Sequence, residues 1–127
     1  MSKKILVVDD DEGIVEVIQM LLESEGYQVE SSLSGDCIPD FPGGTPDLIL
    51  LDVLLSGKDG REICKRLKSD PETDHIPVIM LSAHVDAGRL MRDSGANDFI
   101  EKPFDIDDFT AIVAKHIQHY TSSAEIQ

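Results

Sequence analysis

The chain has 127 residues and a mass of 14.0 kDa, which suits one compact domain and leaves no room for a second folded module. Apolar residues make up 41% and charged residues 28%, a balance that supports a buried core and argues against disorder. Asp and Glu number 25 against 11 Lys and Arg, and the net charge of -14 repels a phosphate backbone, which argues against direct nucleic-acid binding.

The sequence has no segment expected to enter a membrane. Its longest apolar runs, at 48–51 and 78–81, are far shorter than the roughly 20 residues of a transmembrane helix. No signal-peptide pattern precedes Asp9, so we expect a soluble, cytoplasmic protein without membrane contact. Cys37 and Cys64 lack CxxC spacing and are expected to be reduced and structural.

The first part of the chain predicts a strand, a helix and a second strand. Residues 4–8 form a β-branched apolar run that stops at acids, as a buried strand does. From residue 11 or 12 onward, apolar residues recur at helical spacing until Gly26, with acids in the first turn, which predicts an amphipathic helix. Residues 28–32 predict a second, weaker strand.

A proline- and glycine-rich segment precedes the third predicted strand. Residues 34–45 contain Pro39, Pro42 and the pair Gly43-Gly44, so we expect at most one or two helical turns there, followed by a loop. Residues 47–52 then predict a strand as apolar as one covered on both faces.

The remainder of the chain continues the alternation of helices and strands. The predicted elements are a helix at 60–68, a strand at 78–81, a helix at about 86–94, a strand at 98–101 and a helix at 107–120. We expect residues 1–120 to form the domain and residues 121–127 a flexible C-terminal tail. Strands that alternate with helices predict an α/β fold with a parallel sheet covered on both faces, because parallel strands need right-handed crossovers.

Polar residues follow four of the predicted strands. The first strand ends in Asp9 and Asp10, and the third ends in Asp52. The fourth ends in Ser82, and the fifth runs into Lys102. Function in such sheets lies at the carboxyl ends of the strands, so we expect these five residues to converge on one edge.

Three carboxylates at that edge would need a cation. At about 4 Å each pair repels by about 4 kcal/mol at an effective dielectric of 20. Oxygen-only ligands suit Mg²⁺, which takes one or two carboxylates, waters and a phosphate oxygen. Residues 9–11 could instead cap a helix, but Asp52 closes an apolar strand and has no capping role, and Lys102 supplies a cation for a phosphoryl group.

The motifs at 5–11, 47–52, 59–60, 78–83, 95–99 and 102–104 together resemble the receiver domain of two-component response regulators. The resemblance covers nearly the whole chain, in the family's order. It implies a flavodoxin-like, doubly wound, five-stranded parallel sheet with strand order 2-1-3-4-5. It also implies a phosphorylation switch that promotes its own phosphorylation and dephosphorylation, rather than an enzyme acting on a separate substrate.

The resemblance assigns a role to each acid. Asp52 matches the phosphoacceptor, the nucleophile that takes a phosphoryl group from a sensor histidine kinase or a histidine phosphotransfer protein. Asp9 and Asp10 match the acidic pair that holds Mg²⁺ together with Asp52 and the backbone carbonyl of Leu54. A downstream effector protein or domain is the implied second partner.

The resemblance also covers the polar and aromatic residues of the later strands. Ser82 and Lys102 match the hydroxyl and the ammonium group that contact phosphoryl oxygens, and Phe99 matches the aromatic switch position. Ser82 could instead cap the following helix, and Phe99 could as easily be a core aromatic, although neither interpretation excludes function. A cis peptide at Lys102-Pro103 is implied as well.

The chain departs from the family pattern at several positions. Leu55-Ser56 stand where the family usually has Met-Pro, so we expect a looser loop after the third strand. Leu54 and His84 occupy positions that in this family tune how fast water attacks the acyl phosphate. The apolar Leu54 predicts slow autodephosphorylation, while the effect of His84 on that rate is left open. A half-life of seconds for the phosphorylated protein would contradict this. The segment 39–46 departs from the usual second helix and leaves partner recognition on that side open.

Two other functions fit the residues less well. A Mg²⁺-dependent aspartyl phosphatase of similar topology usually carries a second Asp two residues after its nucleophile, where Leu54 stands here. A receiver-like scaffold that is never phosphorylated would not need the complete set of acids with Ser82 and Lys102. The residues do not decide between a stand-alone receiver and the receiver of a longer protein.

Overall fold

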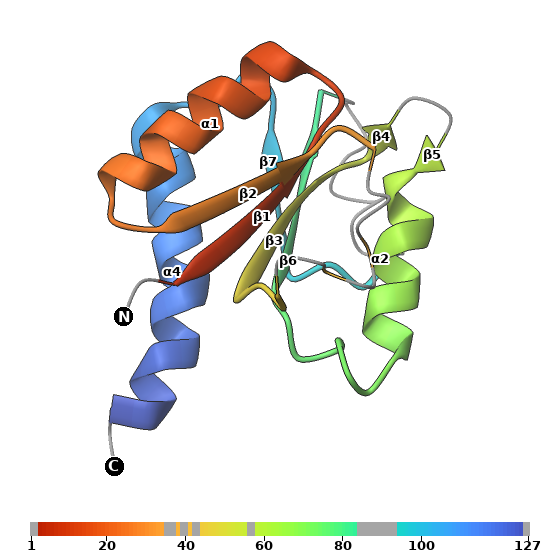
Figure 1. Cartoon of the computed structure of the whole chain (residues 1–127), viewed down its shortest axis with the longest axis vertical. Helices are drawn as coiled ribbons and strands as arrows, with labels where there is room; N and C mark the ends of the chain where they lie inside the picture. The colour runs from red at the N-terminus through yellow and green to blue at the C-terminus, as the bar shows by residue number, and fades with distance from the viewer. Residues whose placement is uncertain are drawn as a thin grey trace.

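The computed structural model describes residues 3–34, 38, 41, 44–55, 58–83 and 94–125. The elements in chain order are β1 (Lys4–Val8), α1 (Glu12–Ser24), β2 (Gln28–Ser32), β3 (Leu48–Asp52), β4 (Leu54–Leu55), β5 (Lys58–Asp59), α2 (Gly60–Ser69), β6 (Val78–Ser82), β7 (Asp98–Glu101) and α4 (Ile106–Glu125) (Figure 1). The helix predicted at about 86–94 falls almost entirely outside the described residues.

The main sheet is parallel and has the order β2-β1-β3-β6-β7. Counted along the chain within this sheet, the order is 2-1-3-4-5, which confirms the predicted doubly wound α/β fold. The register places Asp52 opposite Leu81 and Ser82 opposite Glu101. The carboxyl ends of the three strands β3, β6 and β7 therefore lie side by side.

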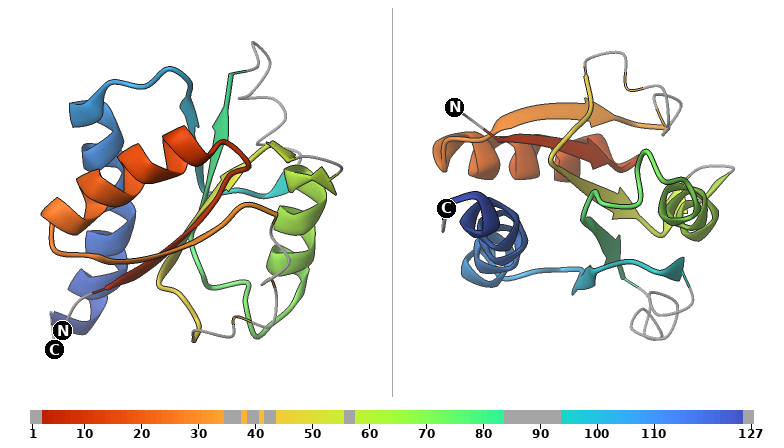
Figure 2. Two further views of the ribbon diagram at one scale, coloured as in Figure 1. Left: turned by 45° about the horizontal axis from the view of Figure 1, so that its top comes forward. Right: turned by 90° about the horizontal axis from the view of Figure 1, so that it is seen from below.

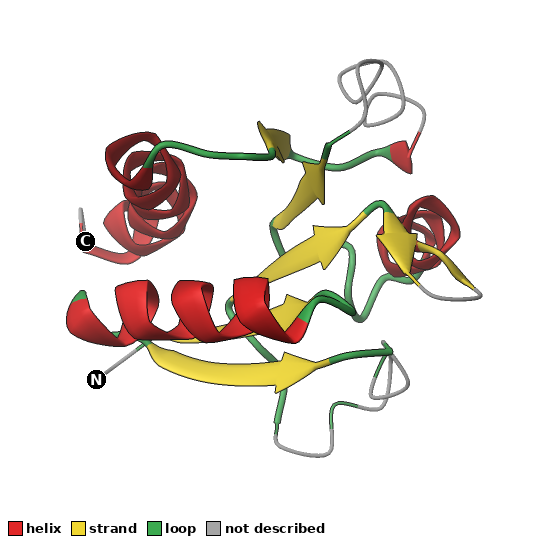
Figure 3. Cartoon of the chain, turned by 90° about the horizontal axis from the view of Figure 1, so that it is seen from above, coloured by secondary structure: helices red, strands yellow, loops and turns green. Residues whose placement is uncertain are grey.

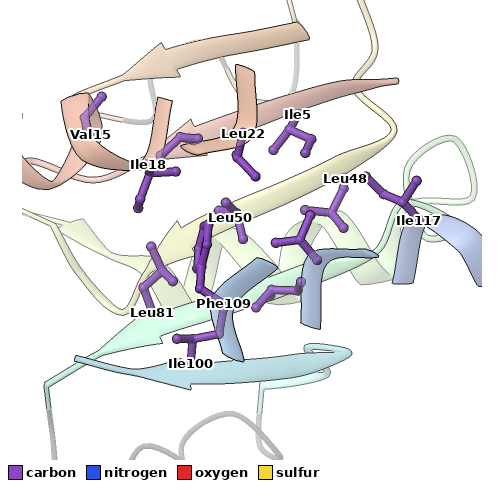
Figure 4. Close-up of a cluster of buried hydrophobic side chains, with 13 residues drawn as sticks. Ile5, Val15, Ile18, Leu22, Leu48, Leu50, Leu81, Ile100, Phe109 and Ile117 are labelled. Carbon is purple, nitrogen blue, oxygen red and sulfur yellow. The ribbon is translucent and has the colours of Figure 1, made fainter. Parts of the chain in front are cut away.

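Helices lie on both faces of the sheet. α1 and α4 cover one face, and α2 lies on the other (Figures 2 and 3). Side chains alternate between these faces along β1: Ile5 and Val7 join the core beneath α1 and α4, whereas Leu6 and Val8 join the core beneath α2. Figure 4 shows the first of these cores, with Phe109 of α4 pointing toward the central strands.

Burial explains which strands the sequence predicts most clearly. Every residue of β3 and β6 is buried, since both strands lie inside the sheet and are covered on both faces. β2 lies at the edge and is partly exposed throughout, which is why its apolar pattern is weaker.

Local signals determine both ends of α1. The Oδ1 atom of Asp11 accepts hydrogen bonds from the backbone N–H groups of Gly13 at 3.0 Å and Ile14 at 3.2 Å, so Asp11 is the N-cap. At the other end Gly26 has a φ of 92°, a left-handed conformation that glycine adopts without steric cost. The chain then turns directly into β2.

The last helix is longer than predicted. α4 runs to Glu125, beyond the predicted helix end at Tyr120, and the expectation that residues 121–127 form a flexible tail stays a prediction. Neither glycine nor proline occurs between Tyr120 and Glu125, so no residue there breaks the helix.

Two short strands follow β3. β4 and β5 form an antiparallel ladder in which Leu54 lies opposite Asp59 and Leu55 lies opposite Lys58. The expectation of a looser loop rests on the missing proline at position 56, and residues 56–57 lie outside the described residues, so it stays a prediction.

The structure describes one of the two cysteines. Cys64 in α2 is buried and forms no disulfide, and Cys37 lies outside the description. No helix among the described residues combines the length and apolar character that crossing a bilayer requires.

Candidate functional site

Three carboxylates meet where β1 and β3 end. Asp9 follows β1 and is fully buried, Asp52 is the last residue of β3 and is 7% exposed, and Asp10 is exposed. One carboxylate oxygen from each residue lies within 4.8 Å of the others. At this spacing one cation can contact all three side chains.

Lys102 brings a positive charge into this cluster from the end of β7. Its Nζ atom lies 2.7 Å from Asp9 Oδ2 and 3.6 Å from Asp52 Oδ1. Its backbone N–H donates to the carbonyl of Ser82 at 2.8 Å, and the peptide bond to Pro103 is cis, as the resemblance implied. The ammonium group thus offsets part of the repulsion between the two buried carboxylates.

The two oxygens of Asp9 have different partners. Oδ2 pairs with Lys102, and Oδ1 accepts a hydrogen bond from the backbone N–H of Asp11 at 3.0 Å. A fully buried carboxylate is costly unless it is paired and hydrogen-bonded in this way. The capping interpretation of residues 9–11 therefore applies to Asp11 alone, because Asp11 provides the acceptor for the start of α1.

Ser82 and Phe99 lie on the strands next to β3. Ser82 is the last residue of β6 and is 2% exposed, one position beyond the residue that pairs with Asp52. Phe99 in β7 is partly buried against the core on the α2 side of the sheet. This packing agrees with a core aromatic and is compatible with a switch position.

Two predicted contributors are less completely described. The backbone of Leu54 lies in β4, two residues after Asp52, while its side chain is outside the description. His84 also lies outside the described residues.

A charged pair at the start of α2 was missed as a site feature. Both carboxylate oxygens of Asp59 accept hydrogen bonds from the Arg61 guanidinium, at 2.7 to 3.2 Å, and Oδ1 also accepts from the Arg61 backbone N–H at 2.9 Å. The hydrogen bonds from Arg61 hold the pKa of Asp59 below its usual value of 3.8 despite partial desolvation. The sequence does contain a signal for this pair, which is an acid two residues before an arginine at the start of a predicted helix.

A cavity of about 410 Å³ opens beside Lys102. It lies between the first half of α1 and the segment after β7, and its lining residues are Asp11, Gly13, Ile14, Val17, Lys102, Pro103 and Phe104. The cavity shares Lys102 with the charged cluster, whereas Asp9, Asp10 and Asp52 are not among its lining residues.

Residues 5–114 match the family model of the response regulator receiver domain. The chain is 42% identical over 108 residues to the response regulator PleD of Caulobacter vibrioides, covering 83% of this chain and 24% of that protein. It is 38% identical over 116 residues to the phosphate regulon transcriptional regulatory protein PhoB of Rhizobium meliloti, covering 89% of this chain and 51% of that protein. The chain thus spans about a quarter to a half of these relatives.

Solved structures agree with this match. A putative response regulator from Chloroflexus aurantiacus superposes with a TM-score of 0.87 at 31% identity, covering 93% of this chain and 99% of that one. The BeF3-activated receiver domain of DrrB superposes with a TM-score of 0.82 at 28% identity, covering 93% of this chain and 99% of that one. Fold, motif order and family model agree, and the chain belongs to the response regulator receiver domain family.

Proposed function

We propose that this receiver domain accepts a phosphoryl group on Asp52 in a Mg²⁺-dependent reaction and changes its partner-binding face in response. The observation that carries the proposal is the cluster of Asp9, Asp10 and Asp52, with Lys102 Nζ 2.7 Å from Asp9 and 3.6 Å from Asp52. A buried carboxylate whose charge is balanced by a nearby cation is suited to act as a nucleophile toward a phosphoryl donor.

The donor set of the cluster fits Mg²⁺. All three side chains offer carboxylate oxygens, the ligands that a hard divalent cation prefers, and the exposed Asp10 leaves room for bound waters. The backbone carbonyl of Leu54 is a fourth ligand that the family resemblance implies. When bound, Mg²⁺ would neutralise charge on the transferring phosphoryl oxygens.

The chain's own residues would carry out the transfer. An oxygen of Asp52 attacks phosphorus, an O–P bond forms, and the P–N bond of the donor phosphohistidine breaks. Lys102 then pairs with one phosphoryl oxygen and the Ser82 hydroxyl donates to another.

The response would spread through β6 and β7. Drawing Ser82 and Lys102 toward the acyl phosphate would displace the ends of both strands, since the Lys102 backbone is hydrogen-bonded to Ser82. Phe99 would then change its packing and alter the surface formed by β7 and the helices beside it. A full reversal of such an equilibrium from 1:99 to 99:1 requires about 5.5 kcal/mol of differential contacts.

The proposed partners follow from this role. Upstream we place a sensor histidine kinase or a histidine phosphotransfer protein, and downstream an effector protein or domain, all in the cytoplasm. In this scheme the domain is a phosphoacceptor switch that promotes its own phosphorylation and dephosphorylation.

Intact-mass measurement after incubation with Mg²⁺ and acetyl phosphate tests the proposal. We expect the wild type to gain one phosphoryl mass, Asp52→Ala to gain none, and the wild type in EDTA to gain none. Asp107→Ala is the matched control, because Asp107 is an exposed acid on α4 that is not one of the three clustered carboxylates. A phosphoryl gain by Asp52→Ala equal to that of the wild type would place the acceptor elsewhere and refute the proposal.

A further inference from the structure

Gly60, the first residue of α2, lies directly against the main chain of Asp52. A Cβ atom at position 60 would stand 2.0 Å from the Asp52 carbonyl oxygen, 3.0 Å from its carbonyl carbon and 3.1 Å from the carbonyl oxygen of Val53. Cβ atoms in proteins essentially never approach other atoms more closely than 3.0 Å. The atoms concerned belong to the backbone and cannot rotate away, so any side chain at position 60 must displace α2 or Asp52.

Backbone conformation does not explain this glycine. The glycines with positive φ among the described residues are Gly26, Gly44 and Gly95, whereas Gly60, the first residue of α2, is not one of them. Helix propensity alone would therefore favour alanine at position 60. The requirement for glycine comes from the close approach of the two backbones.

Several contacts hold the start of α2 at this distance. The backbone N–H of Gly60 donates to the carbonyl of Val53 at 2.8 Å. Asp59 caps the helix through the Arg61 N–H at 2.9 Å and also pairs with the Arg61 guanidinium. Asp59 lies opposite Leu54 in the β4–β5 ladder. The backbone that follows Asp52 is thus tied to the start of α2 by the Gly60 hydrogen bond and by the pairing of β4 with β5.

Resting on the proposed function, we propose that Gly60 is a positioning residue for the phosphoacceptor. Its bare Cα lets the start of α2 support the main chain of Asp52, which keeps the carboxylate within 4.8 Å of Asp9 and Asp10 and 3.6 Å from Lys102. A displacement of about 1 Å at a reacting group can reduce the rate by about 100-fold. Gly60 contacts no reacting atom and acts only through the backbone of Asp52.

Comparison of Gly60→Ala with Gly26→Ala tests this role. Gly26 has a φ of 92°, and no atom lies within 4 Å of the place its Cβ would take, so its substitution strains the fold at a position that contacts nothing in the site. Circular dichroism and thermal unfolding first establish a temperature at which both variants are folded. At saturating Mg²⁺ and acetyl phosphate, we expect the phosphorylation rate to fall by roughly 100-fold in Gly60→Ala and by less than about two-fold in Gly26→Ala.

If Gly60→Ala does not fold, a second pair of variants tests whether the start of α2 positions Asp52. Asp59→Ala removes the cap without adding bulk, whereas Asp59→Ser retains a capping oxygen. We expect the rate to fall several-fold in Asp59→Ala and to recover in Asp59→Ser. Equal rates in both variants and the wild type would overturn the inference.

The outcomes separate this inference from the proposed function. A wild type that gains no phosphoryl group overturns both. A phosphorylated wild type alongside a folded and equally fast Gly60→Ala variant overturns the role of Gly60 alone.

Discussion

Lys102 Nζ donates to Asp9 Oδ2 at 2.7 Å, across 93 positions of sequence. The two residues follow β7 and β1, which are separated in the sheet by β3 and β6. Asp9 is fully buried, so its charge depends on this ammonium group and on one backbone N–H for compensation. Removal of either charge should therefore have a large effect.

Lys102→Met tests the pair. The variant retains an apolar stem but leaves the Asp9 carboxylate without its cation, so we expect a loss of about 3 kcal/mol in the free energy of unfolding. Urea denaturation in EDTA measures this loss. Saturating Mg²⁺ should recover part of it, because a cation that binds only the folded state stabilises that state.

Lys115→Met is the control for this prediction. Lys115 is an exposed residue of α4, and we expect its substitution to change stability by less than about 0.5 kcal/mol. A Lys102→Met variant as stable as this control in EDTA would contradict the predicted dependence of Asp9 on Lys102.

Asp10→Asn should separate stability from metal binding. Without a metal, the exposed Asp10 adds repulsion to the cluster, so the variant should be as stable as the wild type or more stable by up to about 1 kcal/mol. Mg²⁺ affinity, measured by isothermal titration calorimetry, should fall because one carboxylate ligand is lost. Unchanged affinity would exclude Asp10 as a ligand, and Asp107→Asn controls for net charge.

The Asp59–Arg61 pair predicts a pH dependence. The pKa of Asp59 is lowered in the folded state, so its contribution to stability is present above the unfolded value near 3.8 and is lost as pH falls through the lower folded value. The pair is partly exposed, so we expect a contribution of no more than about 1 kcal/mol. Thermal unfolding of the wild type and Asp59→Asn from neutral to acidic pH should show their difference in stability shrinking at low pH. A difference that stays constant would contradict the prediction.

Cys64 should be unreactive in the folded protein. Burial raises the pKa of its thiol, so a smaller fraction is present as the thiolate that reacts with alkylating reagents. Burial also shields the sulfur atom from these reagents. We expect slow modification by iodoacetamide at pH 8 in native buffer and rapid modification in urea, located by peptide mass mapping. Cys64→Ala identifies the signal, and rapid native labelling of Cys64 would contradict its burial.

Phe109 should be a major contributor to stability. It is fully buried, and its ring stacks on Phe104 with centroids 4.8 Å apart. Phe109→Ala should lower the free energy of unfolding by about 3–5 kcal/mol, measured by urea denaturation. Ile106→Ala, at a position that is 54% exposed on the same helix, should have a much smaller effect. Equal losses in the two variants would contradict the proposed packing of α4.

Much of the fold could be predicted because its signals are local. The strands at 4–8, 28–32 and 98–101 have the predicted bounds, since apolar alternation and turn residues are properties of neighbouring positions. The convergence of Asp9 with Asp52 could also be anticipated, because parallel strands place their carboxyl ends at one edge. The β4–β5 ladder was missed because two-residue strands carry no periodic signal.

Other contacts depend on which elements become neighbours. Asp98 in β7 accepts a hydrogen bond from the Phe99 N–H at 2.9 Å and lies 3.0 Å from His116 Nε2 of α4. No periodicity predicts this pairing, because it arises from how α4 crosses the sheet. The need for glycine at position 60 is similar, since the backbone of Asp52 approaches it only after α2 has packed.

The sequence by itself determined the order of the elements and the presence of three acids and a lysine at strand ends, because hydrophobic periodicity and residue type are properties of neighbouring positions in the chain. Only the tertiary structure decided how the charges are shared. Lys102 lies nearer to Asp9, at 2.7 Å, than to Asp52, at 3.6 Å. These distances depend on how strand ends that are far apart in the sequence come together in the sheet, which no local pattern encodes.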